Sequence, residues 1–365
     1  MNDTTEPQHW TKVLKALLLL MLSFALTTAG AEEYYERYDL RPQPGVIRLA
    51  VQPMAYPLAF ISSVMQRDRI LGGELDKAQL KLQVFAFRKG NDIVQVASES
   101  AFDMAFVGDM PTVNLAVRMP IAIGGLGKRN FSSVISRDYA RLEELRGHKL
   151  GYSPGSSSHL VLMHGLRSAK LSERDVELVA LDPAQMPDAL ESGAVDAFSA
   201  WEPTPSIALA RNPRNRAIFK GMSTDWVVLR RSLTTSSPAV AQSLIAAYVR
   251  AINWMRRSKS NLEHAASWVL QDGQAFTGAK SAITAERAME IARKDLLDVP
   301  GAPATPPLVD GAPPLSREFA FLKDIGRIAS DRDDKPLREA FAYQGLTQVQ
   351  ADPKRFSLFR FDYAR

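Results

Sequence analysis

The sequence predicts an α/β fold built on a mostly parallel sheet, followed by a helical C-terminal part. Segments of strand length recur between segments with helical apolar spacing, first over residues 46–124 and again over 149–200. Such alternation is typical of a parallel sheet covered by helices on both faces. From residue 238 onward the pattern changes to long amphipathic segments, which indicate helices.

The expected elements follow in chain order. The first stretch predicts strands at 46–51, 79–87, 103–108 and 121–124, with helices at 58–70, 92–100 and from Pro111. The second predicts strands at 149–153, 176–181, 194–200 and 226–229, with helices at 157–169 and 184–192. Further helices are expected at 238–259, 261–270, 316–330 and 335–343, and the six prolines within 299–316 indicate a surface loop. The tail from Thr347 receives no predicted role.

The N-terminus has the features of a secretory signal peptide. Lys12 and Lys15 precede an apolar run at 16–26, and small residues stand at Ala29 and Ala31. This run is shorter than the roughly 20 apolar residues that span a bilayer. We therefore expect cleavage after Ala31 and a periplasmic mature protein; an uncleaved anchor is the alternative.

Composition narrows the functional classes. The 365 residues include no cysteine, which excludes disulfides and a lipid-modified cysteine. The net charge of +5 is mild for this length, and the basic groups near 211–220 and 250–259 lack interleaved aromatic residues. We therefore expect no nucleic-acid partner.

Catalytic and metal-binding patterns are also missing from the sequence. There is no H-E-x-x-H and no G-x-S-x-G motif. His159 and His164 are five residues apart, so they do not share a helix face as an i, i+4 metal pair would. We expect no enzyme activity, no catalytic residue, no metal and no cofactor.

The turn from Gly151 to His159 is the first candidate ligand site. Glycine, proline and serine separate a predicted strand from a predicted helix, whose N-terminus presents unpaired N–H groups to an anion. Ser156, Ser157 and Ser158 either cap this helix or contact the ligand. His159 is either a residue of the first helical turn or a ligand contact.

Other candidates stand where predicted strands end. Ligands of open α/β sheets bind at the carboxyl ends of strands. Gly108 and Asp109 follow one such strand, and Trp201 and Glu202 follow another. Trp201 is either core or a surface on which the ligand packs, and Glu202 either caps the next helix or accepts from a ligand amine.

Three motifs together resemble the nitrate/sulfonate/taurine-type substrate-binding proteins of ABC importers. They are the Gly-Ser-Ser-Ser-His turn at 155–159, Ser-Gly-Ala-Val-Asp-Ala at 192–197 and Trp-Glu-Pro at 201–203. The resemblance extends over residues 46 to about 330. It implies a two-lobed type 2 periplasmic-binding-protein fold with two hinge crossings, with lobe 1 at 46–135 plus 228–345, lobe 2 at 138–225 and a tail at 346–365.

The resemblance also implies a function. The chain would bind a small anionic or zwitterionic solute of the sulfonate, taurine or nitrate class between the lobes, as a monomer that delivers it to an inner-membrane ABC permease. It adds Gln52 and Tyr56 to the candidate ligand contacts, and we expect hinges near 134–138 and 224–229. The alternatives are a ligand-presenting sensor component and an enzyme like the pyrimidine-precursor synthases, whose cysteine-rich motif this chain lacks.

Overall fold

The computed structural model describes residues 33–98, 101–298 and 302–363. The chain divides into two compact units, Met1–Asp39 and Leu40–Arg365. In the first unit the described residues form turns. The predicted signal peptide and its cleavage site lie outside the described residues. Everything below concerns the second unit.

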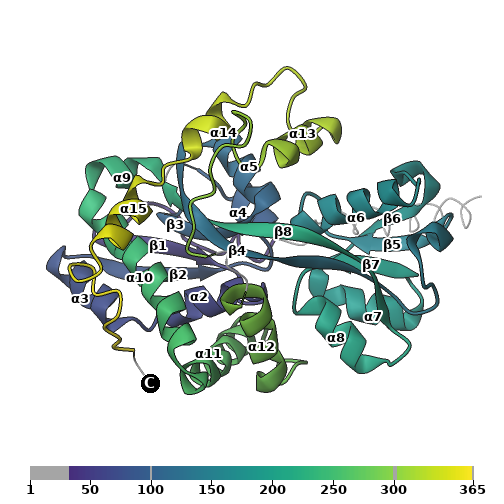
Figure 1. Ribbon diagram of the computed structural model, residues 1–365, viewed down its shortest axis with the longest axis horizontal. Helices are drawn as coiled ribbons and strands as arrows, with labels where there is room; N and C mark the ends of the chain where they lie inside the picture. The colour runs from purple at the N-terminus through teal and green to yellow at the C-terminus, as the bar shows by residue number, and fades with distance from the viewer. Residues whose placement is uncertain (1–32, 99–100, 299–301, 364–365) are drawn as a thin grey trace, which may run out of the picture. The chain divides into compact units, whose positions relative to one another are not determined.

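The second unit is built on one eight-stranded sheet with the order β2-β1-β3-β8-β4-β7-β5-β6. Three strands stand on each side of the central pair β4 and β8, and Figure 1 shows helices over both faces at each end of the sheet. The strands are β1 (Val46–Val51), β2 (Lys81–Ala86), β3 (Met104–Gly108), β4 (Ile121–Ser136), β5 (Lys149–Tyr152), β6 (Glu177–Ala180), β7 (Ala197–Ala200) and β8 (Arg216–Arg230).

The register brings the carboxyl ends of strands from both ends of the sheet to its middle. Strand β3 pairs antiparallel with β8 and ends at Gly108, opposite Asp225. Strand β7 pairs antiparallel with β4 and ends at Ala200, opposite Ser133. Since β1 is parallel to β3 and β5 is parallel to β7, their carboxyl ends also point toward the middle. This is where such sheets bind ligands.

The helices of the first part confirm the predicted alternation. They are α2 (Leu58–Met65), α3 (Arg69–Lys77), α4 (Gly90–Gln95), α5 (Asp109–Arg118), α6 (Ser157–Ser168), α7 (Met186–Ser192), α8 (Thr204–Arg211) and α9 (Arg231–Ser236). Short 3₁₀ turns occupy η1 (Leu142–Leu145), η2 (Glu173–Asp175) and η3 (Pro183–Gln185). The single helix expected at 58–70 is two helices, because the Asp68 carboxylate accepts from the backbone N–H groups of Ile70 and Leu71 and starts α3.

The C-terminal part is helical, as predicted. It comprises α10 (Pro238–Arg257), α11 (Lys259–Thr277), α12 (Ala285–Ala292), the π-helical turn η4 (Arg293–Leu297), α13 (Ser316–Asp324), α14 (Lys335–Ala340) and α15 (Gln344–Ala351). No described residue between η4 and α13 belongs to a helix or to one of the sheet's strands, in line with the expected proline-rich loop. The tail, for which no role was predicted, packs Phe356, Phe361 and Tyr363 against the core.

The two crossing strands are much longer than predicted. The apolar patterns at 121–124 and 226–229 are only one end of a 16-residue strand and a 15-residue strand. These strands pair along their whole length, so the backbone of the polar residues in each strand is paired with the other strand. The two expected hinge segments, 134–138 and 224–229, fall at different ends of this ladder: Val134 pairs with Phe219, whereas Trp226 pairs with Leu126.

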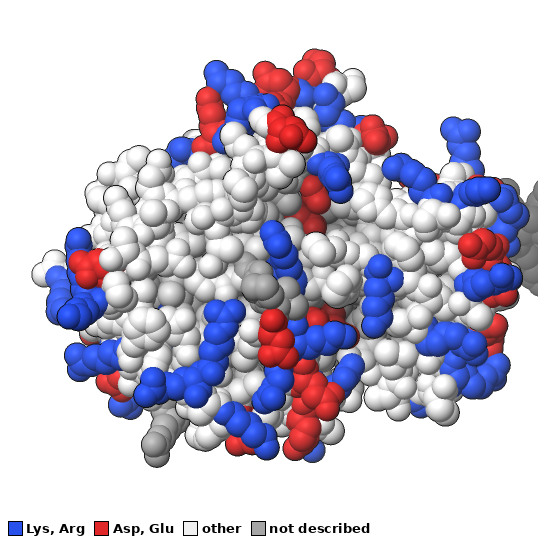
Figure 2. Space-filling model, viewed as in Figure 1, with Lys and Arg blue, Asp and Glu red and all other residues white. Residues whose placement is uncertain are grey.

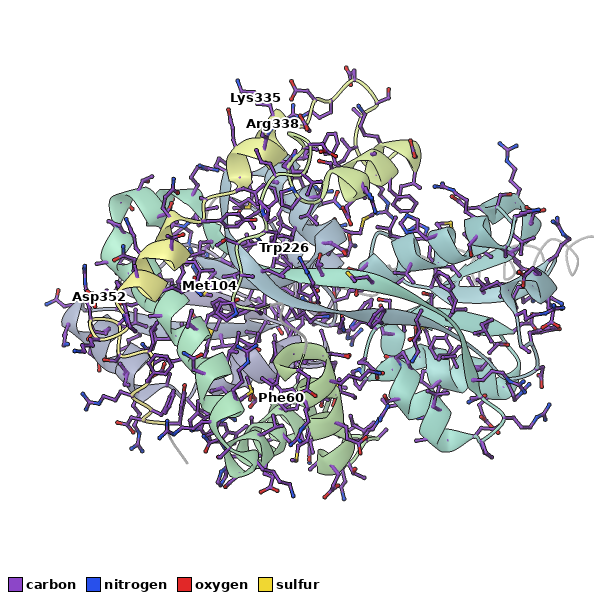
Figure 3. The ribbon with its side chains drawn as sticks, viewed as in Figure 1. Phe60, Met104, Trp226, Lys335, Arg338 and Asp352 are labelled. Atoms are coloured by element: carbon purple, nitrogen blue, oxygen red, sulfur yellow. The ribbon has the colours of Figure 1, made fainter. Side chains whose placement is uncertain are left out.

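The larger apolar core lies under the first end of the sheet. It joins β1 and β3 to α2, α10 and α11, and Phe60 and Met104 are fully buried within it (Figure 3). A smaller cluster around Ile135, Met186 and Phe198 supports the other end. Each end therefore has its own apolar core, and the ladder of β4 and β8 connects the two.

Candidate ligand-binding site

A small cavity of about 30 Å³ lies where the strand ends converge. Its walls come from both ends of the sheet and from the crossing strands. They are Gln52, Ala55, Gly90, Gly108, Pro111, Lys128, Ser156, Ser157, Trp201, Ser223 and Asp225. Five of the ten predicted site residues are among them: Gln52, Gly108, Ser156, Ser157 and Trp201.

A buried ion pair forms part of this cavity. Lys128 of β4 is 3% exposed, and its Nζ lies 2.9 Å from Asp225 Oδ2 and 2.6 Å from Asn130 Oδ1. Ser223 donates its hydroxyl hydrogen to Asn130 Oδ1 at 2.9 Å. A buried charge requires such partners. The site therefore presents an ammonium that is held in place by a carboxylate and an amide.

The turn before α6 has the geometry of a capped helix start. Gly155 adopts a φ of +71°, a conformation that glycine tolerates without the penalty of a side chain. Ser156 Oγ accepts from the backbone N–H of His159 at 3.3 Å and donates to the Ser153 carbonyl at 2.7 Å. Ser158 is fully buried and lies 2.9 Å from Ser156 Oγ. Ser157 is the half-buried serine that faces the cavity.

Asp109 connects the N-terminus of α5 to Ser157. Its carboxylate accepts hydrogen bonds from the Ser157 hydroxyl, from Thr224 N at 3.1 Å and from Met110 N at 2.7 Å. Burial nevertheless raises the pKa of Asp109 to about 6. The neighbouring Gly108 is required by close approach, because a Cβ there would lie 2.7 Å from Ser157 Oγ. The predicted anion site thus already has a carboxylate of the chain beside it.

Trp201 and Glu202 are adjacent in the sequence, but they line different cavities. The Trp201 side chain lines the cavity, whereas Glu202 lines a different one. The Glu202 carboxylate accepts from Ser206 N at 3.2 Å, as expected of a residue that caps α8. The Glu202 carbonyl accepts from the Tyr56 backbone N–H at 2.9 Å, which joins the loops after β1 and β7. Tyr56 itself is 1% exposed, and burial raises its pKa.

His159 lies in an aromatic cluster outside the cavity. Its ring centroid is 4.7 Å from that of Tyr152 and 5.3 Å from that of Phe321 of α13. Burial and the nearby Arg327 guanidinium lower the pKa of His159 to about 4, so the imidazole is neutral near pH 7. Helix α13, which also packs against α5, therefore contacts elements from both ends of the sheet.

Glu318 of α13 adds a second titrating carboxyl near the site. Burial raises its pKa to about 7, and the charge of Asp109 contributes to the rise. Asp225 thus lines the site beside the buried ammonium of Lys128, Asp109 bonds to Ser157 of the lining, and Glu318 lies near Asp109.

Sequence reasoning missed Lys128, Asp225 and Ser223. No element was predicted over 125–130, and Asp225 fell in an expected hinge segment just before the predicted strand at 226–229. Only the pairing of β4 with β8 places them at the cavity. Within the described part of the chain, no group of three or more His, Cys, Asp or Glu could hold a metal ion. None of the described helices has the length and apolar character needed to cross a membrane.

Comparisons with known proteins identify the relatives of this chain. The model of the NMT1-like family matches residues 49–270. An aliphatic sulfonates-binding protein of Escherichia coli is 29% identical over 135 residues, which cover 35% of this chain and 42% of that protein. An aliphatic sulfonates-binding protein of Bacillus subtilis is 23% identical over 231 residues, which cover 60% of this chain and 67% of that protein. The alignment thus spans less than half of the E. coli relative.

Solved structures confirm the predicted fold class. The periplasmic aliphatic sulphonate binding protein SsuA of E. coli superimposes with a TM-score of 0.63 at 20% identity, covering 82% of this chain and 98% of SsuA. The periplasmic nitrate-binding protein NrtA of Synechocystis superimposes with a TM-score of 0.61 at 14% identity, covering 87% of this chain and 91% of NrtA. The desulfurization enzyme DszB superimposes with a TM-score of 0.56 at 17% identity, covering 85% of this chain and 99% of DszB. The fold is therefore that of periplasmic binding proteins, and it also occurs in an enzyme.

Proposed function

Because this chain belongs to the NMT1-like family, we propose that it is the exported solute-binding component of an ABC importer. Its ligand is a small anionic or zwitterionic solute of the sulfonate, taurine or nitrate class. The observation that carries this proposal is the cavity in which Lys128, Ser157 and Trp201 meet from three different elements. The names of the sequence relatives and of the structural neighbours support the same class of ligand.

The donors around the cavity suit an oxyanion. Lys128 supplies an ammonium, Ser157 a hydroxyl, and the first turn of α6 its unpaired N–H groups. Gln52 is anchored by donating to the Phe106 carbonyl at 2.8 Å, and Trp201 adds an apolar wall. Asp225 and Asp109 hold these donors in the absence of ligand. A bound anion would take over part of their hydrogen bonds.

Opening of the cavity is part of the proposal, because about 30 Å³ is roughly the volume of one water molecule. Several contacts link the two ends of the sheet, among them the Tyr56 N–H to Glu202 carbonyl bond, the Asp109 to Ser157 bond and the ion pair of Lys89 with Asp182. We propose that these contacts break when the two ends of the sheet move apart about β4 and β8. Solution scattering should then show compaction when ligand is added.

Export and the partner are inferred from two sources. The N-terminal pattern is that of a signal peptide, and the structural neighbours are periplasmic proteins. Cleavage after Ala31 would leave Glu32 as the first residue, which terminal sequencing of the secreted protein tests. The permease partner distinguishes this function from a ligand-presenting sensor. Co-purification with an inner-membrane permease in the presence of ligand supports transport, whereas capture by a receptor alone supports the sensor.

An enzyme on the same fold is the second alternative, since DszB shares it. The pyrimidine-precursor synthases, which resemble the substrate-binding family, use a cysteine-rich motif, and this chain has no cysteine. Product analysis after long incubation separates the two functions. Recovery of unchanged ligand agrees with a binding protein, and a converted product contradicts it.

The decisive experiment is a titration of the purified protein with ethanesulfonate, taurine and nitrate by isothermal calorimetry. We expect saturable binding of at least one of them with one site per chain in this cavity. Binding to the native state alone stabilises it by about 2.7 kcal/mol at a ligand concentration of one hundred times Kd, so the melting temperature must also rise. No binding of any of the three contradicts the proposed ligand class.

A further inference from the structure

A second cavity of about 330 Å³ lies between α8 and the segment formed by α12 and η4. It shares no lining residue with the site described above. Figure 2 shows charged side chains of both signs over α12 and toward α8. The charged residues of the cavity wall are Glu202, Lys220, Arg287, Glu290, Arg293, Lys294, Asp295 and Asp298. Its volume is within the range of small-molecule sites.

Asp295 is the unusual member of this wall. It is 8% exposed, and its carboxylate makes no hydrogen bond or ion pair with any residue that the structure describes. A largely buried carboxylate is costly unless cations or donors approach it, and the charges of Lys128, Lys294 and Lys220 stabilise Asp295 whereas that of Glu202 opposes them. Asp295 belongs to the π-helical turn η4, a distortion that is frequent at functional sites. Its position therefore indicates that a positively charged or hydrogen-bond-donating group binds there.

The exposed part of the cavity wall carries both signs of charge, and two of its cations are Lys220 and Lys294. Lys220 of β8 and Lys294 of η4 are exposed and line the cavity, and neither forms an ion pair with a described residue. Arg287, by contrast, is engaged: its guanidinium donates to Ser206 Oγ of α8 at 3.1 Å and pairs with Glu290 at 2.8 Å. This contact closes one side of the cavity between α12 and α8. A buried anion thus lies inside, and two unpaired ammonium groups stand at the entrance.

We propose that this cavity binds a small zwitterion, with its ammonium group on Asp295 and its anionic group at Lys220 and Lys294. Glu202 supplies a second acceptor on the opposite wall, where its carboxylate accepts from Ser206 N at 3.2 Å and from no other described residue. A purely anionic ligand leaves Asp295 without a directly bound donor, and a purely cationic one leaves the two lysines without a directly bound acceptor. A zwitterion satisfies both ends.

The test uses β-alanine as the probe, at a pH of about 8, where its ammonium and carboxylate groups are both charged. Ethylammonium and propionate serve as its cationic and anionic halves, and ethanesulfonate monitors the first site. We expect the purified protein to bind β-alanine more tightly than either half. Asp295→Asn should weaken β-alanine by about tenfold or more, the usual effect of losing a hydrogen bond to a charged group.

Asp298→Asn is the matched control, because Asp298 lines the same cavity but is exposed. It should change β-alanine affinity by less than about threefold, in keeping with the weak effect of exposed charges. Lys220→Met with Lys294→Met should weaken β-alanine but should not weaken ethylammonium, because both lysine charges repel a cation at Asp295. If the unmodified protein does not bind ethanesulfonate, the first site is refuted, and the proposal for this second cavity is unaffected.

Two results would overturn the inference. One is the absence of β-alanine binding by the unmodified protein. The other is equal β-alanine affinity of the unmodified protein and Asp295→Asn, with melting temperatures showing that both are folded.

Discussion

Lys128 and Asp225 stand directly opposite each other in the antiparallel ladder of β4 and β8, and their side chains form an ion pair of 2.9 Å. Both are buried, and both line the candidate site. The pair lies between Leu126–Trp226 and Phe131–Met222 in the register, where the carboxyl ends of strands from both ends of the sheet converge. One interaction therefore joins the two crossing strands and supplies the ammonium for ligand binding.

The first prediction concerns this ion pair. Lys128→Met leaves the Asp225 carboxylate buried without its cation, so we expect it to lower the free energy of unfolding by about 3–5 kcal/mol. Asp225→Asn should destabilise by a comparable amount. The double variant removes both charges and should be more stable than either single variant. Denaturant unfolding of the four proteins measures this, and additive losses in the double variant would contradict a coupled pair.

The second prediction separates a ligand contact from a helix cap. Ser157→Ala removes the hydroxyl that faces the cavity, so ethanesulfonate affinity should fall about tenfold to a hundredfold. Ser158→Ala is the matched control one residue away. Ser158 is fully buried and bonded to Ser156, so its loss should lower the melting temperature and leave affinity nearly unchanged. Calorimetry measures the ethanesulfonate affinity of both variants, and thermal unfolding measures their stability. A loss of affinity in Ser158→Ala but not in Ser157→Ala would assign ligand binding to the buried serine.

The third prediction is a pH dependence of anion binding. Burial raises the pKa of Asp109 to about 6 and that of Glu318 to about 7, so both carboxyls lose their charge as the pH falls from 8 to 5. Asp225 and Lys128 are the other charged groups near Asp109. Because ethanesulfonate keeps its charge over this range, it should bind more tightly at pH 5 than at pH 8.

Glu318→Gln should flatten this profile, mainly between pH 6 and 8. Glu263→Gln, a change at an exposed position of α11, should leave the profile as it is. Calorimetry at four pH values tests this. Affinity that is independent of pH in the unmodified protein would show that neither carboxyl acts on the bound anion.

The sequence predicted the fold better than the site. Strand and helix alternation depends on local periodicity, and 46–51, 103–108 and 149–153 were all recognised as strands. The Gly-Ser-Ser-Ser turn was also visible, because the backbone conformation at Gly155 and the cap at Ser156 are local. These features follow from residues within one turn of each other.

The chemistry of the cavity depends on contacts between distant residues. Lys128 and Asp225 are 97 positions apart and become partners only through the register of β4 and β8. Likewise, nothing local shows that Trp201 and Glu202 face different cavities. No element was predicted around Asp295, and its burial is set by the packing of η4 against β4. Such residues are found from the tertiary structure.

The last prediction concerns the destabilisation of the ligand-free protein by the carboxylate of Asp295. Burial raises the pKa of Asp295 above its unfolded value. The native state therefore binds more protons than the unfolded state between these two pKa values, and this group lowers stability as the pH rises through that window. Asp295→Asn lacks the charge, so at pH 8 it should be more stable than the unmodified protein by about 1 kcal/mol or more.

The advantage should shrink as the pH falls and Asp295 takes up a proton in the native state, which its raised pKa favours. Denaturant unfolding at pH 4, 6 and 8 measures it, with Asp298→Asn as the exposed control. A loss of stability in Asp295→Asn at pH 8 would mean that the carboxylate is satisfied within the fold. Saturating β-alanine should reverse the order at pH 8, because the ligand supplies the missing partner only to the unmodified protein. A stability cost that a ligand removes distinguishes a binding residue from one that is merely buried.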